Sequence, residues 1–308
     1  MSDKILLLGA GRRVSFAERL EDAGLQIFSY EKEKNAPIGE VAKIIEGYDW
    51  TASELYAHIL HNCMLHEIKL ILPLDDKSAT LASSIASHDK NLVTPACRRS
   101  VATLCYDKQA FAGMIGGVFP GIYPFVKENQ RVILKPRYGN GSKGISVVDY
   151  SDIPDEDNLR EHNLIAQRYI ENGTEYTVDS YFSKNGDLVD AVPRIRLRVA
   201  DGEVVDSKTV KDKELINLVE ELGQNIPFSG PVCFQFIRNP TGTYIMEINA
   251  RFGGGCILSL QAGFDMIDCM IREYISGAPV CHTKGGWIDG IVMRRVHREF
   301  FYEDSSRP

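Results

Sequence analysis

Residues 233–255 decide the fold, and they read "CFQFIRNPTGTYIMEINARFGGG". Two runs of β-type residues flank "NPTG", which predicts two antiparallel strands joined by a tight turn. In the second run Glu247, Asn249 and Arg251 recur at every second position, so they share one face of the strand. A carboxylate beside an amide oxygen suits Mg²⁺, and a guanidinium binds a phosphate or carboxylate through two hydrogen bonds. The alternative is a solvated face on which Glu247 and Arg251 only pair.

A second informative segment lies upstream, at residues 133–148, "ILKPRYGNGSKGISVV". It predicts a strand, a glycine-rich loop and a second strand. The spacing is not that of a P-loop and no helix follows, so the loop is expected to cover phosphates from above. Lys135, on the first strand, would place a fixed positive charge in the same space. The alternative is an ordinary exposed hairpin.

A third segment, residues 165–179, reads "IAQRYIENGTEYTVD". An apolar strand ends at residues 167–170, a turn follows, and Glu175 opens the next strand. Such a crossing offers backbone donors and acceptors to an adenine edge, and Glu175 could accept hydrogen bonds from ribose hydroxyls. Taken alone, the segment fits an ordinary hairpin at least as well.

The first 104 residues have a different pattern. Strands are expected at residues 4–8, 25–30 and 68–74, and helices at residues 14–23, 51–61 and 75–89. This alternation predicts a doubly wound parallel-sheet α/β domain. The turn "GAGRR" (residues 9–13) is either a tight strand-to-helix connection or a helix N-terminus that faces an anion with help from Arg12 or Arg13. Later in the chain, antiparallel strands predominate, with helices expected at residues 211–225 and 259–276.

In their order along the chain, "DK" at residues 107–108, "ILKP" with its glycine loop, "QRYIENGTEY" and "QF…MEINAR" resemble the ATP-grasp superfamily over about residues 106–289. Within it the chain looks like the carbamoyl-phosphate-synthase-large-subunit-like and amino-acid-ligase-like branch. The resemblance implies an α/β plus α+β fold. Its expected parts are a pre-ATP-grasp domain (residues 1–104), a small ATP-grasp subdomain with a glycine-rich lid (105–177) and a C-terminal subdomain (178–308).

The resemblance also implies site residues. Mg²⁺, with Mn²⁺ as an alternative, would be bound by Glu247, Asn249 and Gln235. Arg251 and Lys135 would be catalytic. The residues expected to bind ATP are Lys108, Lys135, Gly139, Gly141, Ser142, Lys143, Gly144, Gln167, Arg168, Tyr169, Ile170, Glu175 and Gln235.

Arg168 departs from the usual pattern of the superfamily at the hinge. Many relatives carry a glutamate at the hinge where this chain has Arg168, and a guanidinium cannot accept a hydrogen bond from the adenine amino group. Gln167 or backbone carbonyls are expected to replace it.

In "PRIRLRV", Arg194, Arg196 and Arg198 share one strand face. Arg194, Arg196 and Arg251 are expected to bind a substrate carboxylate; the alternative for Arg194 and Arg196 is an exposed edge strand or a dimer contact.

The expected function is an ATP-dependent carboxylate–amine ligase that acts through an acyl phosphate. The alternatives are carbamoyl-phosphate-type activity on bicarbonate, with a partner chain, and a non-catalytic nucleotide-binding module. A net charge of −7 argues against a nucleic-acid partner, and no apolar run approaches the ~20 residues that span a bilayer. Seven scattered cysteines argue against a zinc site or disulfides. We expect a cytoplasmic enzyme of small-molecule substrates, with a homodimer as the default.

Overall fold

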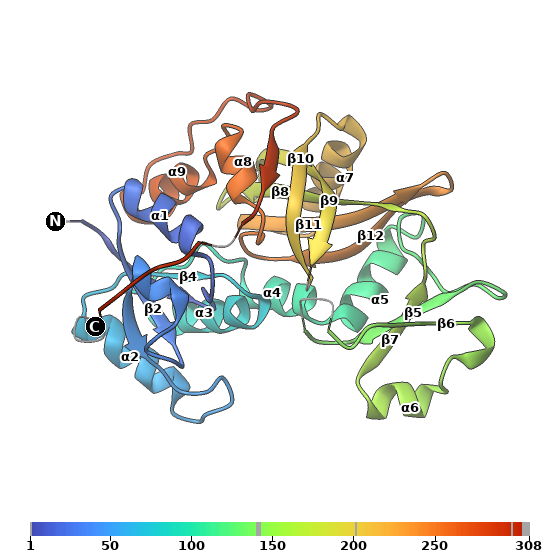
Figure 1. The fold of residues 1–308 in the computed structure, drawn as a ribbon, viewed down its shortest axis with the longest axis horizontal. Helices are drawn as coiled ribbons and strands as arrows, with labels where there is room; N and C mark the ends of the chain where they lie inside the picture. Colours follow the sequence, from blue (N-terminus) through green and yellow to red (C-terminus); the bar gives the residue numbers. More distant parts are fainter. Residues whose placement is uncertain (1, 140–142, 201, 297, 304–308) are drawn as a thin grey trace.

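The strands form three β-sheets within residues 2–139, 143–200, 202–296 and 298–303, which the computed structural model describes. Figure 1 shows them as three separate parts of the molecule. The division of the chain at residues 104 and 177 remains a prediction. The mixed α/β content agrees with the expected fold class.

The N-terminal sheet is parallel, with the strand order β3-β2-β1-β4. Alternate residues of β1 enter two different cores: Ile5 and Leu7 belong to one, and Leu6 and Leu8 to the other. A strand buried on both faces must be apolar throughout, which explains the run "ILLL". The strands are β1 (Lys4–Leu8), β2 (Gln26–Glu31), β3 (Lys43–Glu46) and β4 (Leu70–Pro73).

The large sheet has the order β12-β11-β8-β9-β10-β13, and its strands pair antiparallel. The predicted hairpin around "NPTG" is confirmed, since Asn239 pairs with Gly242 at its end. One face of this sheet is apolar and carries Phe234, Phe236 and Ile248. The strands are β8 (Thr174–Phe182), β9 (Leu188–Ala200), β10 (Glu203–Thr209), β11 (Gly230–Asn239), β12 (Gly242–Asn249) and β13 (Val292–Arg294).

The small sheet is antiparallel, with the order β6-β5-β7. Its strands are β5 (Val132–Pro136), β6 (Ser146–Val148) and β7 (Leu164–Arg168), so the two predicted strands around the glycine-rich loop are present. Residues 140–142 of that loop lie outside the described residues. Lys135 on β5 reaches the large sheet, because its Nζ donates to the Met246 carbonyl oxygen at 3.2 Å.

Helices cover the apolar faces. Leu215, Val219 and Leu222 of α7 and Phe111 and Ile115 of α5 pack on the large sheet. The face of the N-terminal sheet that carries Ile5 and Leu7 packs against the C-terminal helices, and the two form one shared core. The helices are α1 (Val14–Asp22), η1 (Pro37–Glu40), α2 (Leu55–Leu65), α3 (Asp76–His88), α4 (Arg99–Tyr106), α5 (Lys108–Val118), η2 (Tyr150–Asp152), α6 (Glu156–Glu161), α7 (Lys213–Asn225), α8 (Ile257–Gln261), α9 (Met266–Met270) and η3 (Ile271–Ser276).

The single helix predicted over residues 259–276 is wrong. The chain forms α8, then a break, then α9 and the π-helical turn η3. Gly263 adopts φ +104°, a conformation no helix interior allows. The break turns Phe264 into the core beneath the N-terminal sheet. Apolar periodicity could not reveal it, because the residues on both sides of the break are apolar.

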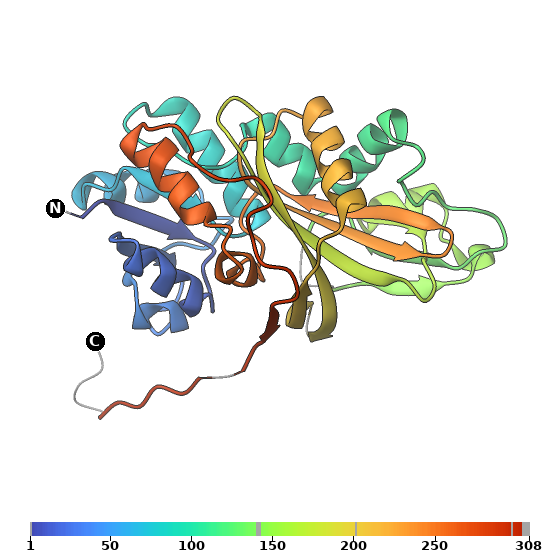
Figure 2. The ribbon, with the colours of Figure 1, turned by 90° about the horizontal axis from the view of Figure 1, so that it is seen from above.

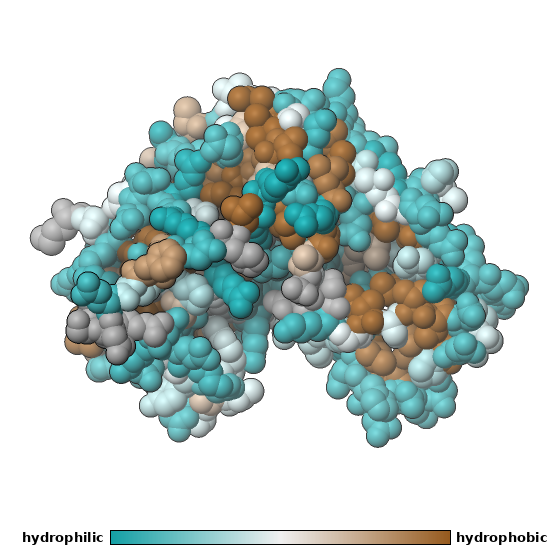
Figure 3. Space-filling model, in the orientation of Figure 1, coloured by the Kyte–Doolittle hydropathy of each residue, from teal (hydrophilic) through white to brown (hydrophobic). Residues whose placement is uncertain are grey.

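The C-terminal segment after β13 runs back toward the N-terminal sheet, as Figure 2 shows. Arg298 NH1 donates to Glu18 Oε1 of α1 at 2.6 Å, which ties the segment to that side. Figure 3 shows a hollow between the part that carries β1–β4 and the part that carries β5–β7. In the described part of the chain, no helix is both long and apolar enough to cross a bilayer.

Candidate functional site

Glu247 on β12 is the centre of a hydrogen-bonded row on the polar face of the large sheet. Its Oε1 accepts from Gln235 Nε2 at 2.7 Å and from Asn249 Nδ2 at 3.4 Å. Asn249 Oδ1 in turn accepts from Arg251 NH2 at 3.1 Å. The predicted common strand face is therefore observed for Glu247 and Asn249, while Arg251 lies just beyond the end of β12 and joins the row through its hydrogen bond to Asn249. β11 and β12 pair Gln235 directly with Glu247, which brings the fourth residue to the row.

The row continues across the sheet toward β8 and β9. Gln235 Oε1 accepts from Arg196 NH1 at 3.0 Å. The same Arg196 nitrogen, on β9, lies 3.1 Å from Glu175 Oε2. Glu175 belongs to β8, which lies between β9 and β11. Glu175, predicted for the ribose, is half exposed and so lies at the open end of the row.

At its other end the row reaches the N-terminal part through Asp76, a residue that the sequence analysis had placed only at a helix start. Arg251 NH2 donates to Asp76 Oδ2 at 3.1 Å, and both side chains are buried. Burial raises the pKa of Asp76, against the influence of Arg251. Asp76 Oδ1 and Arg251 Nε have no partner among the described residues. The signal that could have indicated Asp76 is its position: it follows β4, and ligands bind at the carboxyl edge of parallel sheets.

Two lysines approach the row from the small sheet and from α5. Lys135 is buried, and burial lowers the pKa of its ammonium to about 8 despite the nearby Glu247 carboxylate. Lys108, the first residue of α5, lies 4.0 Å from Glu247 Oε2 and donates to the Gly139 carbonyl oxygen at 2.6 Å. Asp107 directly precedes this helix, the position that a capping aspartate takes, and it accepts from the backbone nitrogens of Gln109 and Ala110. The cap fixes Lys108 beside the row.

Of the glycine-rich loop, only the flanks are described. Gly139 contacts Lys108 as above, Lys143 is exposed, and Gly144 adopts φ +70° close to Pro136. Gly141 and Ser142, both predicted to bind ATP, lie outside the described residues. Their role, and that of the loop as a lid, stays a prediction.

The predicted hinge spans the end of β7 and the residues after it. Gln167 is buried; its Nε2 donates to the Tyr123 hydroxyl at 2.8 Å, while its Oε1 has no partner in the described part of the chain. The Arg168 guanidinium lies over the Tyr244 ring, 4.4 Å from its centroid. The Tyr169 backbone nitrogen donates to the Arg131 carbonyl oxygen, and Ile170 is buried. Among the described side chains of this hinge, Gln167 therefore has a buried acceptor without a partner.

Arg194 differs sharply from Arg196 in its surroundings. Its side chain is 1% exposed, and it forms two hydrogen bonds with Asp179, at 2.6 and 3.2 Å. The alternative of an exposed edge strand is wrong for this residue, because β9 lies between β8 and β10. A substrate role for Arg194 stays a prediction; the described geometry gives it a structural partner. Arg196, paired with Gln235 and Glu175, lies in the row itself.

Two glycines after Arg251 leave room for the buried pair of Arg194 and Asp179. A Cβ at Gly253 would lie 2.7 Å from Asp179 Oδ1, and one at Gly255 would lie 2.6 Å from Arg194 NH1. Only glycine allows the chain to pass so closely over the pair. Two of the three glycines in the "GGG" run, Gly253 and Gly255, thus have a packing reason. In the "GAGRR" turn, Arg13 NH1 donates to the Phe252 carbonyl oxygen at 3.0 Å, beside Arg251.

The donor set fits a magnesium ion that shares its coordination with phosphates. Glu247 supplies one carboxylate, and Gln235 and Asn249 supply amide oxygens that here accept from arginines. Nowhere in the described ranges do three or more His, Cys, Asp or Glu residues form a metal-binding group. Mg²⁺ commonly binds one or two carboxylates together with substrate phosphates and water. The site would therefore hold the ion only with the nucleotide.

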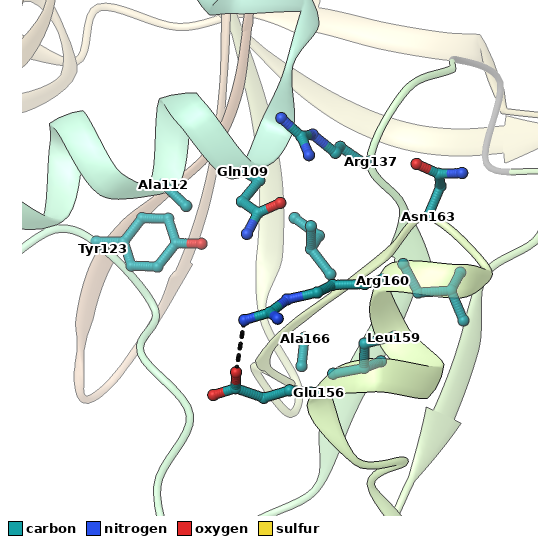
Figure 4. A pocket seen from close by; sticks show the side chains of 11 residues that line it. Gln109, Ala112, Tyr123, Arg137, Glu156, Leu159, Arg160, Asn163 and Ala166 are labelled. Atoms are coloured by element: carbon teal, nitrogen blue, oxygen red, sulfur yellow. Dashed lines mark hydrogen bonds and ion pairs between the residues drawn. The ribbon is translucent and has the colours of Figure 1, made fainter.

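A cavity of about 450 Å³ lies beside this site, between α5, α6 and β7. Figure 4 shows Gln109 and Tyr123 on one side and Arg160, paired with Glu156, on the other. Of the described residues that line it, none is a predicted site residue. The cavity is therefore separate from the row around Glu247.

Comparisons with known proteins agree with this architecture. Residues 160–297 match the family ATPgrasp_Ter, described as ATP-grasp in the biosynthetic pathway with Ter operon. The biotin carboxylase domain of Hydrogenobacter thermophilus 2-oxoglutarate carboxylase, in complex with MgADP, ADP and bicarbonate, superposes with a TM-score of 0.75 at 16% identity, over 95% of this chain and 73% of that one. No protein of curated function is detectably similar in sequence.

A second structure of this kind is N5-carboxyaminoimidazole synthetase from Staphylococcus aureus, complexed with ADP. It superposes with a TM-score of 0.74 at 14% identity, over 96% of this chain and 83% of that one. Campylobacter jejuni biotin carboxylase, in its β-γ-ATP complex, gives 0.70 at 16% identity over 95% and 74%. The chain therefore has the ATP-grasp fold.

Proposed function

We propose that the chain is a Mg²⁺- and ATP-dependent ligase that joins a carboxylate to an amine through an acyl phosphate. The observation that carries the proposal is the hydrogen-bonded row from Asp76 through Arg251, Asn249 and Glu247 to Gln235, with two lysines beside it. Cations outnumber carboxylates there, which suits a polyphosphate. A branch close to the carbamoyl-phosphate-synthase-like and amino-acid-ligase-like proteins is part of the proposal.

The nucleotide base would bind at the hinge. The unpartnered, buried Oε1 of Gln167 is an acceptor suited to the adenine amino group. Arg168, held on Tyr244, leaves that position to Gln167. Glu175, at the open end of the row, would accept from the ribose hydroxyls. The hinge would thus bind adenine without the glutamate that many relatives carry.

The phosphates would lie between Glu247 and the lysines. Lys108 and Lys135 would bind their oxygens, and binding of an anion would favour the charged form of Lys135, whose pKa burial lowers to about 8. When bound, Mg²⁺ would neutralise phosphate charge and position the reacting group. Glu247, with the amide oxygens of Gln235 and Asn249, would hold it.

The reaction would need no side-chain nucleophile. A substrate carboxylate oxygen would attack the γ-phosphorus and displace ADP; the amine would then attack the acyl carbon and release phosphate, losing a proton to solvent. Arg251, oriented by Asp76 and Asn249, would stabilise charge on the transferred group, and Arg196 would bind the carboxylate. Positioning and charge neutralisation would supply the rate enhancement.

A second candidate function uses bicarbonate as the carboxylate. The biotin carboxylase domain of similar fold was solved in complex with MgADP, ADP and bicarbonate. In that case phosphate release would depend on bicarbonate, and no amino acid or other organic acid would replace it. The non-catalytic alternative is disfavoured because Glu247 and Asn249, the expected metal ligands, lie together in the row.

A phosphate-release assay with Mg-ATP tests the proposal. The protein would be combined with a matrix of organic carboxylic acids and amines, and with bicarbonate alone. Release that needs one acid and one amine supports the ligase. Release on bicarbonate with silence elsewhere reverses the ranking of the two candidates, and no release under any condition supports the nucleotide-binding module.

Lys135→Ala should weaken ATP binding by roughly 10- to 100-fold, the loss of a charge-assisted hydrogen bond. Because the pKa of Lys135 is about 8, wild-type affinity should fall as the pH rises from 7 to 9, since phosphate favours the protonated ammonium. The variant should lose that pH dependence. Titration calorimetry at pH 7, 8 and 9 measures both effects. Exposed Lys213→Ala is the matched control, and an unaltered ATP affinity in Lys135→Ala would refute the assignment.

A further inference from the structure

A small pocket of about 120 Å³ opens at the carboxyl end of β1 and β2 in the N-terminal sheet. Gly9, which follows the last residue of β1, lines it together with Glu31, the last residue of β2. The loop after β3 brings Tyr48 and Trp50 to its wall. Neither the proposed nucleotide site nor the proposed acyl-transfer chemistry uses any of these residues.

The aromatic wall is held in place by the residues behind it. The Tyr48 backbone nitrogen donates to the Tyr30 hydroxyl at 3.0 Å, and that hydroxyl is hydrogen-bonded to His58 Nδ1 at 2.8 Å. The Tyr48 ring packs edge-on against the His58 ring, with centroids 4.8 Å apart. The loop therefore has a fixed position over the end of the sheet, and the pocket is preformed.

The two carboxylates at the pocket differ in their hydrogen bonding. Both oxygens of Asp49 are taken, Oδ1 by Thr51 and Oδ2 by Lys32. Glu31 accepts only at Oε1, from the Ser29 hydroxyl at 2.7 Å and the Gly11 backbone nitrogen at 3.4 Å.

In the described ranges no cation or donor meets Glu31 Oε2. Burial also raises the pKa of Glu31, as expected for a carboxylate that lacks a cationic partner. The pocket thus contains one unsatisfied negative charge.

The pocket adjoins the row through Gly9. A side chain at Gly9 would overlap the Asp75 carboxylate, so the two residues pack tightly. Asp75 caps α3, and the next residue, Asp76, holds Arg251. A molecule in this pocket would therefore lie on the side of the row opposite the predicted nucleotide hinge.

We propose that this pocket binds the ammonium group of a small organic amine, and that this amine is the acceptor substrate, which would pass one proton to Glu31 Oε2 before its nitrogen attacks the acyl carbon. A free carboxylate oxygen beside aromatic side chains is the arrangement that recognises such cations. The carboxylate disfavours an anion, and the charge of an ammonium group distinguishes an amine from a polyol at this site. The assignment as acceptor rests on the proposed ligase function; the binding site does not.

Trp50 fluorescence tests the site directly, without nucleotide. The chain has two tryptophans, and Trp287 is buried against Lys211, away from this pocket. The probes are matched pairs in which a hydroxyl replaces the ammonium: ethanolamine with ethylene glycol, and L-alanine with L-lactate. The ammonium member of at least one pair should change the fluorescence saturably and bind at least about 10-fold more tightly than its partner. The Trp50→Phe variant should lose the signal.

Glu31→Gln keeps the shape of the side chain and its hydrogen bonds to Ser29 and Gly11, and it removes the charge. It should weaken amine binding by at least about 10-fold. Glu33→Gln, two positions along and exposed, is the matched control and should bind as the wild type does. Equal affinity for amine and hydroxyl probes, or unchanged amine affinity in Glu31→Gln, would overturn the proposal.

The two proposals fail in different ways. Amine-specific fluorescence that depends on Glu31 supports the site even where the phosphate-release matrix shows no turnover, which would count only against the ligase. Amine-dependent turnover with an unchanged amine KM in Glu31→Gln would overturn the site while the ligase proposal stands.

Discussion

Glu247→Ala is expected to lower Mg²⁺-dependent ATP turnover by at least about 10³-fold. Glu247 is the central carboxylate of the row, hydrogen-bonded to Gln235 and Asn249 and 4.0 Å from Lys108. Its loss removes the expected metal ligand and the anion that balances two lysines. Phosphate release in saturating Mg-ATP measures the effect. Calorimetry with and without Mg²⁺ should show that the ion no longer strengthens nucleotide binding.

Two controls accompany this variant. Glu247→Gln retains the volume of the side chain and should lose turnover to a similar degree, because the charge and not the shape binds the metal. Glu221→Ala, on α7, should leave turnover unchanged, since α7 packs against the apolar face of the large sheet. Circular dichroism checks that the fold is intact. Turnover within a few-fold of wild type in Glu247→Ala would disprove the metal assignment.

Arg194→Ala should reduce the free energy of unfolding by about 3–5 kcal/mol, the typical loss when one partner of a buried ion pair is removed. Asp179 would remain buried, and of its hydrogen-bond donors among the described residues it would keep the Ser259 hydroxyl, at 2.6 Å. Urea denaturation at pH 7 measures the loss.

Arg198→Ala, on the same strand, is the matched control. Arg198 pairs with Asp206, but its side chain is 60% exposed, so the expected change is below about 1 kcal/mol. If Arg194→Ala unfolded like the wild type and instead raised the KM of the acid substrate, the substrate role predicted from the sequence would be restored.

Local patterns in the sequence were enough to locate the centre of the candidate site. The alternation in residues 246–251 placed Glu247, Asn249 and Arg251 on one face, and the turn "NPTG" placed β11 beside β12, which brought Gln235 opposite Glu247. Such inferences succeed because strand periodicity and hairpin register act over a few residues. The same holds for the Asp107 cap that positions Lys108.

Residues far apart in the chain required the tertiary structure. Asp76 precedes Arg251 by 175 positions, and only the packing of the N-terminal sheet against the C-terminal helices joins them. Similarly, Arg194, Arg196 and Arg198 look equivalent in the sequence. Their side-chain exposures of 1, 12 and 60% depend on what covers each part of β9.

By itself, the sequence determined the elements whose signals are local: the β11–β12 hairpin, the polar strand face, the Asp107 cap of α5 and the strands on each side of the glycine-rich loop. The tertiary structure alone decided which charges are buried in pairs and which remain open to a ligand. The physical reason is that burial and charge pairing depend on which surfaces meet across the chain. Neither side-chain periodicity nor turn chemistry carries that information.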